Sequence, residues 1–348
     1  MKQIVLNRPG HFEVQTTEKP SAGEGMALIR INAVGICGSD MHLYRKGHIG
    51  NIQMTDPLVI GHECMGQVEA VGEKVPKDLI GRRVAVEPAM PCGTCRWCKS
   101  GLHNVCPEVA FLGLPPTPGA MQEYLVHPAH LLERLPDSLN DAEGVIMEPL
   151  AIALHGVRLA KVKPGQTIVI LGTGVIGTCV MSLLGLYDHL RIVCVDLLKD
   201  RLARAEQMGA TQTVLLTSRE PALEGIMDAT DGLGADIVFE CAGTPDTLWL
   251  MCEAAGPAGH IAAIGSNPDD QVIFSSGTSR RKGLTIRCVR RSLNTLDECI
   301  RLAAAGKIDV KPLVTHTFPA SKADDAFRIV ESYGDGVLKT VIDMKDWK

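Results

Sequence analysis

A glycine-rich turn joins two apolar segments in the second half of the chain. The apolar run 167–171 is followed at once by the sequence Gly172-Thr173-Gly174-Val175-Ile176-Gly177. This order predicts a strand over 167–171, a tight turn, and a helix that continues to about Tyr187. Glycines let the backbone turn sharply and approach a ligand closely, and the first N–H groups of the helix are free to bind phosphate. The segment therefore predicts a dinucleotide-binding βα unit.

Further apolar runs of strand length follow at 191–195, 235–239 and 260–264. The segments between them are long enough for crossover helices, which favours parallel strands. Because the strands are apolar almost throughout, the sheet is expected to be covered on both faces. We predict an α/β fold with a doubly wound nucleotide-binding domain over 152–286.

An acidic residue ends the second of these strands. Asp196 lies nineteen residues after Gly177, where its carboxylate can accept hydrogen bonds from both adenosine ribose hydroxyls and would repel a 2′-phosphate. The position favours NAD over NADP. Arg201 is expected to lie against the adenine or, as the alternative, to recruit that phosphate. The nicotinamide is expected near the strand end at Ile264.

The first part of the chain has a different pattern of apolar residues. Short runs at 27–31, 66–71 and 83–86 lie between Gly and Pro residues, which indicates a small β-rich, barrel-like domain over 1–151. After about 285 the regular alternation stops, and 287–348 is expected to return to this first domain. Two domains are the usual outcome for 348 residues.

Four cysteines form a tight cluster, Cys92, Cys95, Cys98 and Cys106. Four thiolates can close a tetrahedral zinc site and leave no open position for chemistry. The cluster therefore predicts a structural zinc that holds the lobe at about 90–107. Four unliganded thiols are the alternative, but exposed clustered thiols invite oxidation.

A second set of candidate ligands is dispersed along the chain. Cys37, His62, Glu63 and Glu148 taken singly could be a core thiol, a core histidine and ordinary acids. Jointly they supply a thiolate, an imidazole and one or two carboxylates, a mixed set that can hold zinc with an exchangeable water.

The bulk composition narrows the classes of partner and compartment. Forty acidic and 35 basic residues give a net charge of −5 without long runs of one sign, which argues against nucleic-acid and anionic-membrane partners. No apolar stretch is long enough to span a bilayer, and the first residues lack the features of a signal peptide, so the cytoplasm is expected. Reduced cysteines fit that compartment. Seven more are expected mostly in the core, namely Cys64, Cys179, Cys194, Cys241, Cys252, Cys288 and Cys299.

The whole chain resembles the zinc-containing medium-chain dehydrogenase/reductase family. The resemblance rests on Gly61-His62-Glu63 with the Cys37 segment, the four-cysteine lobe, Glu148-Pro149 and the coenzyme glycines, in the family's order and spacing. It is strongest toward polyol (sorbitol/xylitol-type) dehydrogenases and nearly as strong toward L-threonine 3-dehydrogenases. It implies a GroES-like first domain, NAD, two zinc ions per chain and a homo-oligomer, a dimer or commonly a tetramer. It also implies that Cys37, His62 and Glu63 bind the catalytic zinc, with Glu148 as an exchanging ligand or water-orienting residue.

The same resemblance implies the chemistry. Zinc would polarise the substrate oxygen, and Ser39 followed by His42 would relay the released proton toward solvent. The leading expectation is oxidation of a secondary hydroxyl of a polyol or sugar-derived alcohol. L-threonine 3-dehydrogenase, a small-aldehyde reductase and a redox-silent NAD-binding structural protein are the alternatives.

Substrate choice depends on a late segment of the chain. Polyol dehydrogenases resemble one another in an Arg-Tyr pair, and here the matching stretch keeps Arg291 but has Ser292 in place of the tyrosine. If Arg291 faces the pocket, a sugar acid is a plausible substrate, because a guanidinium matches a carboxylate with two hydrogen bonds. Otherwise Arg291 is one of several surface arginines in a basic stretch.

Overall fold

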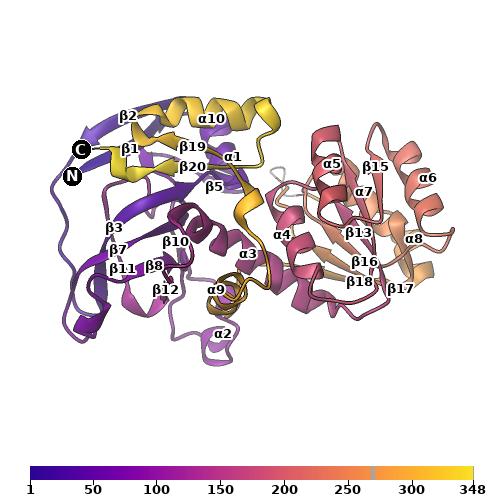
Figure 1. Cartoon of the computed structure of the whole chain (residues 1–348), viewed down its shortest axis with the longest axis horizontal. Helices are drawn as coiled ribbons and strands as arrows, with labels where there is room; N and C mark the ends of the chain where they lie inside the picture. The colour runs from indigo at the N-terminus through magenta and orange to yellow at the C-terminus, as the bar shows by residue number, and fades with distance from the viewer. Residues whose placement is uncertain (268–270, 348) are drawn as a thin grey trace. The chain divides into compact units, whose positions relative to one another are not determined.

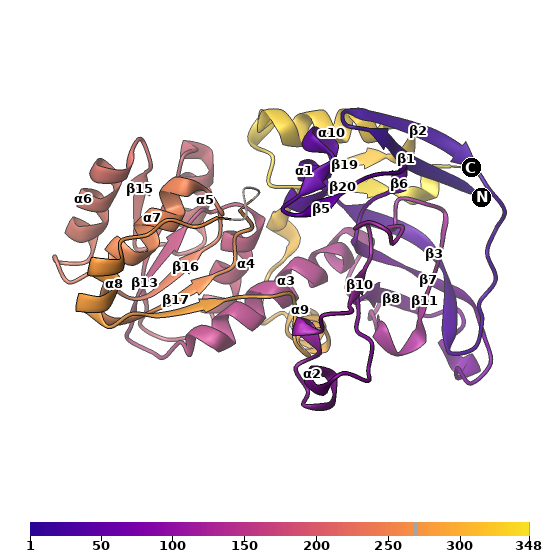
Figure 2. The same cartoon turned by 180° about the vertical axis from the view of Figure 1, so that it is seen from behind.

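The computed structural model describes residues 1–267 and 271–347; residues 268–270 and 348, which fall within the predicted second and third segments, lie outside that description. The chain forms two compact units, shown from opposite sides in Figures 1 and 2. The first comprises Met1–Glu148, Leu293–Gly306 and Val310–Lys348, and the second Pro149–Ser292 and Lys307–Asp309. Each unit is described separately below.

The second unit is built on a six-stranded parallel sheet with the strand order β15-β14-β13-β16-β17-β18. Its strands are β13 (Thr167–Leu171), β14 (Arg191–Asp196), β15 (Gln212–Leu215), β16 (Ala235–Glu240), β17 (Ala255–Ala263) and β18 (Thr285–Cys288). In chain order this is the 3-2-1-4-5-6 arrangement of dinucleotide-binding sheets, with the switch point between β13 and β16.

Helices cover both faces of this sheet. They are α4 (Val175–Leu184), α5 (Lys199–Gln207), α6 (Arg219–Ala229), α7 (Pro245–Ala254) and α8 (Ser276–Lys282). Val193 and Val195 of β14 belong to one buried cluster with residues of α6 and α7. Cys194, between them, contacts Met181 of α4 at 3.5 Å between the sulfur atoms. Successive strand residues face opposite sides, so both sides are packed, and the predicted doubly wound α/β class is confirmed.

Two details of the sheet differ from the sequence expectation. Strand β17 begins at Ala255, five residues before the predicted 260–264, and ends at Ala263, so Ile264 follows it. Strand β18 continues the parallel sheet to Cys288, past the point where the strand–helix rhythm was expected to stop. Small residues and glycines in 255–259 hide the start of β17 from an apolar pattern, and β18 has two half-buried and two exposed residues.

The first unit contains a seven-stranded sheet in the order β12-β8-β7-β3-β20-β19, with β11 also paired to β3. The strands are β3 (Met26–Gly35), β7 (Glu63–Val71), β8 (Arg83–Val86), β11 (Tyr124–Pro128), β12 (Leu132–Arg134), β19 (Val314–Pro319) and β20 (Lys339–Asp343). The smaller sheets contain β1 (Lys2–Arg8), β2 (His11–Thr16), β6 (Leu58–Val59), β9 (Ala89–Met90), β10 (Ala110–Phe111), β4 (His48–Ile49) and β5 (Ile52–Gln53). Strands from both ends of the sequence thus share one sheet.

Few helices accompany these strands. They are α1 (Gly38–Lys46), α2 (Arg96–Lys99), α9 (Leu296–Ala304), α10 (Ala323–Ser332) and the first part of α3 (Asp141–Ala160), which continues into the second unit from Pro149. Short 3₁₀ turns lie at Lys77–Leu79, His103–Val105, Ala129–Leu131, Lys311–Leu313, Ala320–Lys322, Gly334–Gly336 and Met344–Asp346. Phe12, Tyr44 and Phe327 pack their rings 4.7–5.4 Å apart in the core of this unit. Within the described ranges, no helix has both the length and the apolar composition needed to cross a bilayer.

Candidate functional site

Three of the dispersed candidate ligands converge in the first unit. The Cys37 sulfur, a ring nitrogen of His62 and a carboxylate oxygen of Glu63 all lie within 4.8 Å of one another. Cys37 stands immediately before α1, and Glu63 opens β7, where the β3–β7 pairing sets it opposite Gly35. The ladder therefore brings together ligands that are about 25 residues apart in the sequence. Glu148, on α3, is buried as well.

A buried carboxylate supports two of these ligands. Asp40, which is 1% exposed, accepts a hydrogen bond from the Cys37 backbone N–H at 2.9 Å and one from the Gly61 N–H at 3.2 Å. Its Oδ1 also lies 3.5 Å from Nδ1 of His62. Asp40 was not among the residues predicted from the sequence. The available signal was its place in the first turn of a helix, where acidic residues are favoured.

A buried lysine supports the third ligand. Lys339, the first residue of β20, is 1% exposed, and its Nζ lies 2.5 Å from Oε2 of Glu63 and donates to the Ile36 carbonyl at 2.9 Å. A side chain at Gly35 would collide with the same Oε2. No local pattern could have indicated Lys339, because its partner is 276 residues away in the sequence.

The charges around the three ligands favour a divalent cation. With Cys37 as a thiolate and His62 neutral, which are the forms that bind a metal, Cys37, Asp40 and Glu63 carry three negative charges against one positive charge on Lys339, a surplus of two. Burial lowers the pKa of His62, but the neighbouring Asp40 and Cys37 outweigh it and raise that pKa well above its usual value. Burial, reinforced by Glu63 and Glu87, raises the pKa of Glu148 to about 8, although His62 and Lys339 oppose the rise. The donor set and its charge fit Zn²⁺.

Four sulfur atoms form a second possible metal site in the same unit. Cys92, Cys95, Cys98 and Cys106 place their sulfurs within 4.8 Å of one another, and the Cys106 sulfur is 3.6 Å from that of Cys92 and 3.9 Å from that of Cys95. Tetrahedral zinc with bonds of about 2.3 Å would set its sulfurs about 3.8 Å apart. Hydrogen bonds from Thr94 and from the Cys95 backbone lower the pKa of Cys92 to about 6, toward the thiolate form. The cluster therefore fits a closed zinc site.

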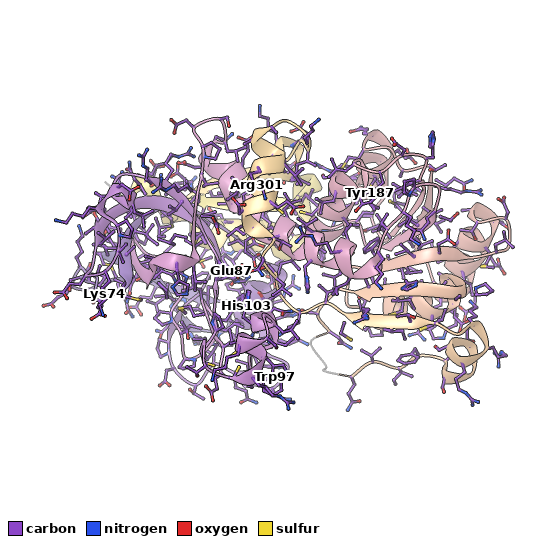
Figure 3. All side chains as sticks on the ribbon, turned by 90° about the horizontal axis from the view of Figure 1, so that it is seen from below. Lys74, Glu87, Trp97, His103, Tyr187 and Arg301 are labelled. Carbon is purple, nitrogen blue, oxygen red and sulfur yellow. The ribbon has the colours of Figure 1, made fainter. Side chains whose placement is uncertain are left out.

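The lobe around these sulfurs has little core of its own. Helix α2, which carries Trp97 between Cys95 and Cys98, has no buried residue. Figure 3 places Trp97 at the lower margin of the first unit in that view. Because a metal would replace a missing hydrophobic core here, this site fits a structural role.

The two predicted proton-relay residues lie on α1. Ser39 and His42 are one helical turn apart, just after Cys37, and both are half-buried. Both side chains are thus accessible to some solvent beside a candidate metal ligand. Their role as a relay stays a prediction.

The glycine turn of the second unit is closely packed. A side chain at Gly177 would collide with the Gly172 carbonyl, and one at Gly172, whose φ is +91°, would lie 2.7 Å from Cβ of Ala242. Gly174 caps α4, so Val175 and Ile176 form the start of that helix. A glycine turn that delivers a helix N-terminus at the carboxyl end of β13 fits the pyrophosphate of a dinucleotide.

Asp196 already has protein partners. Its Oδ2 accepts hydrogen bonds from the N–H and the hydroxyl of Thr173, and its Oδ1 accepts one from the Leu198 N–H. A guanidinium nitrogen of Arg201 lies 3.9 Å from Oδ2. The carboxylate stands at the predicted position, but several of its acceptor positions are filled. Ile264 follows β17 and donates its N–H to the Glu240 carbonyl at 2.8 Å.

The candidate substrate contact Arg291 lies in the second unit. Arg291 is half-buried in a bend after β18, with a φ of +55°, and belongs to a different unit from the three converging ligands.

Among the seven cysteines expected mostly in the core, Cys288 is exposed and Cys241 is half-buried, while the other five are buried. Cys288 ends the edge strand β18, where a side chain can face solvent.

Comparisons with known proteins agree with this arrangement. Residues 23–137 match the alcohol dehydrogenase GroES-like domain, and residues 175–305 match the zinc-binding dehydrogenase domain. A zinc-type alcohol dehydrogenase-like protein of Escherichia coli is 37% identical over 99% of both chains. A sorbitol dehydrogenase of Bacillus subtilis is 33% identical (98% and 97% of the two chains), and an L-idonate 5-dehydrogenase of Vitis vinifera is 34% identical (96% and 92%).

Solved structures with bound coenzymes are similar along the whole chain. One, described as a short chain alcohol dehydrogenase of Escherichia coli complexed with NADH, is 28% identical with a TM-score of 0.91. Another, a zinc-binding dehydrogenase of Sinorhizobium meliloti bound to NADP, is 26% identical with a TM-score of 0.89. Each comparison covers 99% of both chains. With both matched domains, relatives that are similar over nearly the whole chain, and a converging thiol, imidazole and carboxylate, the chain belongs to the zinc-containing medium-chain dehydrogenase family.

Proposed function

We propose that the protein oxidises a secondary hydroxyl of a polyol or sugar-derived alcohol to a ketone, with NAD as hydride acceptor and two zinc ions per chain. The observation that carries the proposal is the convergence of half-buried Cys37 with buried His62 and Glu63, a set that in its metal-binding forms has, with Asp40 and Lys339, two surplus negative charges. The relatives named sorbitol and L-idonate dehydrogenase support the substrate class. A homo-oligomer is proposed from the family resemblance.

When bound, zinc would supply a Lewis acid that favours loss of the hydroxyl proton, and NAD⁺ would take the hydride from the same carbon. Alcohol and NAD⁺ thus become ketone, NADH and one proton. The protein must hold the ligands and move that proton. Asp40 fixes the His62 ring and the start of α1, and Lys339 fixes Glu63.

Proton transfer is assigned to side chains beside the ligands. The Ser39 hydroxyl would receive the proton, and His42, one turn later on α1, would pass it to solvent. Glu148 is buried and has a pKa near neutrality, since burial raises it to about 8, so it can exist in either protonation state at working pH. We assign it to orienting the group that occupies the fourth zinc position.

The test is NAD reduction by purified protein with sugar alcohols, sugar acids, L-threonine and simple alcohols, each with and without a zinc chelator. Chelator-sensitive turnover of a sugar alcohol is the expected result. A preference for a sugar acid would move the substrate to the class of the L-idonate relative and would favour Arg291 as a substrate contact. Absence of turnover on every hydroxyl compound, despite two bound zinc ions and NAD binding, would refute the proposed activity.

A further inference from the structure

Thr173, in the glycine turn, donates hydrogen bonds to Asp196, the carboxylate that is expected to bind the adenosine ribose of the coenzyme. Thr173 lies between Gly172 and Gly174 and is 2% exposed. Its backbone N–H and its hydroxyl donate to the same atom, Oδ2 of Asp196, at 2.7 and 3.0 Å. The Thr178 hydroxyl donates to the Gly174 carbonyl at 2.7 Å, lies 3.1 Å from the Thr173 carbonyl, and ties the turn to α4. Thr173 is therefore a fixed double donor to Asp196.

The acceptor capacity of Asp196 is nearly used up by these bonds. A carboxylate offers about four lone-pair positions, two on each oxygen. Thr173 takes both positions on Oδ2, and the Leu198 N–H takes one on Oδ1 at 3.0 Å. One position remains. A ribose with free 2′ and 3′ hydroxyls can donate two hydrogen bonds, so one of them has no acceptor on Asp196 while the Thr173 hydroxyl stays in place.

We propose that Thr173 determines coenzyme specificity by competing with the adenosine ribose for Asp196. The inference rests on the proposed function, because it concerns the coenzyme of the same reaction. Of the two Thr173 donors, only the hydroxyl depends on the side chain; the backbone N–H is present whatever residue stands there. A residue without a hydroxyl would leave one position on Oδ2 open to the ribose.

The competition affects NAD and NADP differently. NAD can use a second acceptor position, because both of its adenosine ribose hydroxyls are free. NADP cannot, because its 2′ oxygen carries the phosphate. Arg201, 3.9 Å from Asp196, partly offsets the negative charge that would repel this phosphate. The Thr173 hydroxyl thus lowers the affinity for NAD and reduces the difference between the affinities for NAD and NADP.

The experiment measures dissociation constants for NAD⁺ and NADP⁺ by calorimetric titration of the zinc-loaded protein and its Thr173→Ala and Thr173→Ser variants. One charge-assisted hydrogen bond gained by the ribose corresponds to about a tenfold change in affinity. We expect Thr173→Ala to bind NAD⁺ about tenfold more tightly and NADP⁺ with a change below about threefold. Thr173→Ser, which keeps the hydroxyl, should retain the wild-type ratio. If Thr173→Ala does not fold, Thr173→Gly is used in its place, because it also lacks the hydroxyl.

The outcomes separate the two proposals. Equal or weaker NAD⁺ binding by Thr173→Ala, with an unchanged melting temperature, would overturn the competition and would mean that the hydroxyl assists the ribose. A Thr173→Ser variant that behaves like alanine would also overturn it, because the effect would then come from the lost methyl group. Failure of the wild-type protein to bind either dinucleotide would refute the coenzyme assignment itself.

Discussion

Replacement of Lys339 by methionine should destabilise the first unit far more than loss of an ordinary ion pair. The ammonium group of Lys339 is buried against Glu63 and the Ile36 carbonyl. Removing one partner of a buried ion pair leaves the other charge uncompensated, at a cost of about 3–5 kcal/mol. Methionine has a similar length and an apolar side chain, so the loss of stability measures removal of the charge and not creation of a cavity.

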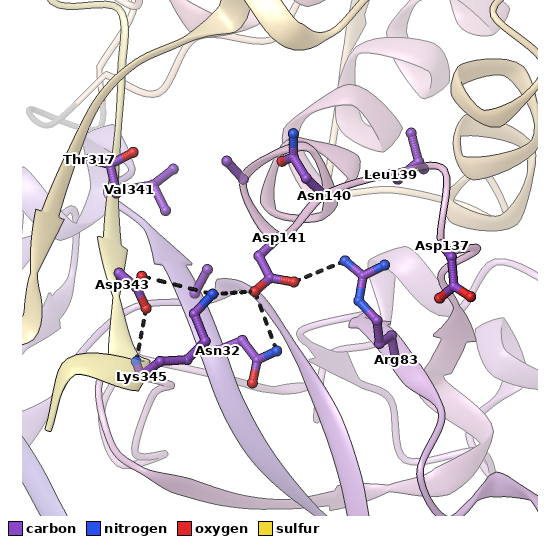
Figure 4. Close-up of a pocket in the computed structure, with 12 residues that line it drawn as sticks. Asn32, Arg83, Asp137, Leu139, Asn140, Asp141, Thr317, Val341, Asp343 and Lys345 are labelled. Carbon is purple, nitrogen blue, oxygen red and sulfur yellow. Dashed lines mark hydrogen bonds and ion pairs between the residues drawn. The ribbon is translucent and has the colours of Figure 1, made fainter. Parts of the chain in front are cut away.

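A matched control lies six residues further along the chain, in the 3₁₀ turn that follows β20. Lys345 also pairs with a carboxylate, Asp141, at 2.8 Å, but its side chain is 49% exposed. Figure 4 shows this pair beside Arg83 in the wall of a pocket of about 430 Å³. Exposed pairs contribute about 0–1 kcal/mol, so Lys345→Met should have a small effect.

The assay is urea unfolding of both variants and the wild type at neutral pH with zinc held in slight excess, followed by bound-zinc analysis. We expect the unfolding midpoint of Lys339→Met to fall strongly and its zinc content to drop toward one ion per chain, since Glu63 loses its support. A destabilisation below about 1 kcal/mol, or one equal to that of Lys345→Met, would refute the reasoning from burial. Lys339→Arg keeps the positive charge, so its unfolding midpoint should lie between those of the wild type and Lys339→Met.

Three more predictions concern the metals and one buried histidine. Cys95→Ser should remove one zinc ion and lower the melting temperature before it changes the rate of hydride transfer, which calorimetry and single-turnover kinetics can separate. Cys37→Ala should remove the other zinc ion and nearly all turnover but leave NAD binding intact; full activity with one zinc lost would contradict the site. His127 is fully buried, its Nε2 donates to the Glu87 carbonyl at 2.9 Å, and burial lowers its pKa to about 4. As the pH falls, His127 therefore takes up a proton in the unfolded state before it does so in the folded state. This difference lowers the free energy of unfolding between about pH 6.5 and pH 4, by at most about 3 kcal/mol. His127→Leu should therefore lose less stability than the wild type between pH 7.5 and 5, and parallel pH profiles would disprove it.

The sequence predicts best what neighbouring residues determine. Strand β13 has the predicted bounds 167–171, because an apolar run followed by glycines is a local signal. Asp196 likewise falls at its predicted strand end. The partners that fill the acceptor positions of Asp196 were not predicted, since the rotamer of Thr173 depends on how β13 and β14 are paired.

The supports of the candidate zinc site are the least predictable part. Lys339 reaches Glu63 only because β20 pairs with β3, and β3 pairs with β7. A lysine at that position reads as an ordinary solvent-exposed residue until the order of the strands is known. Cys288 shows the opposite error, because free cysteines are usually buried, whereas this one ends an edge strand and is exposed.

The order in which the first unit receives its strands has a consequence for protein synthesis. Residues 149–292, which form most of the second unit, leave the ribosome between β7 and the strands β19 and β20. A nascent chain can therefore complete the parallel sheet of the second unit while residues 33–35 of β3 still lack their pairing with β20 and Glu63 still lacks Lys339. Domains usually fold in order of synthesis. Here the unit whose synthesis begins second can finish folding first, and the candidate zinc ligands acquire their final surroundings only after β20 emerges.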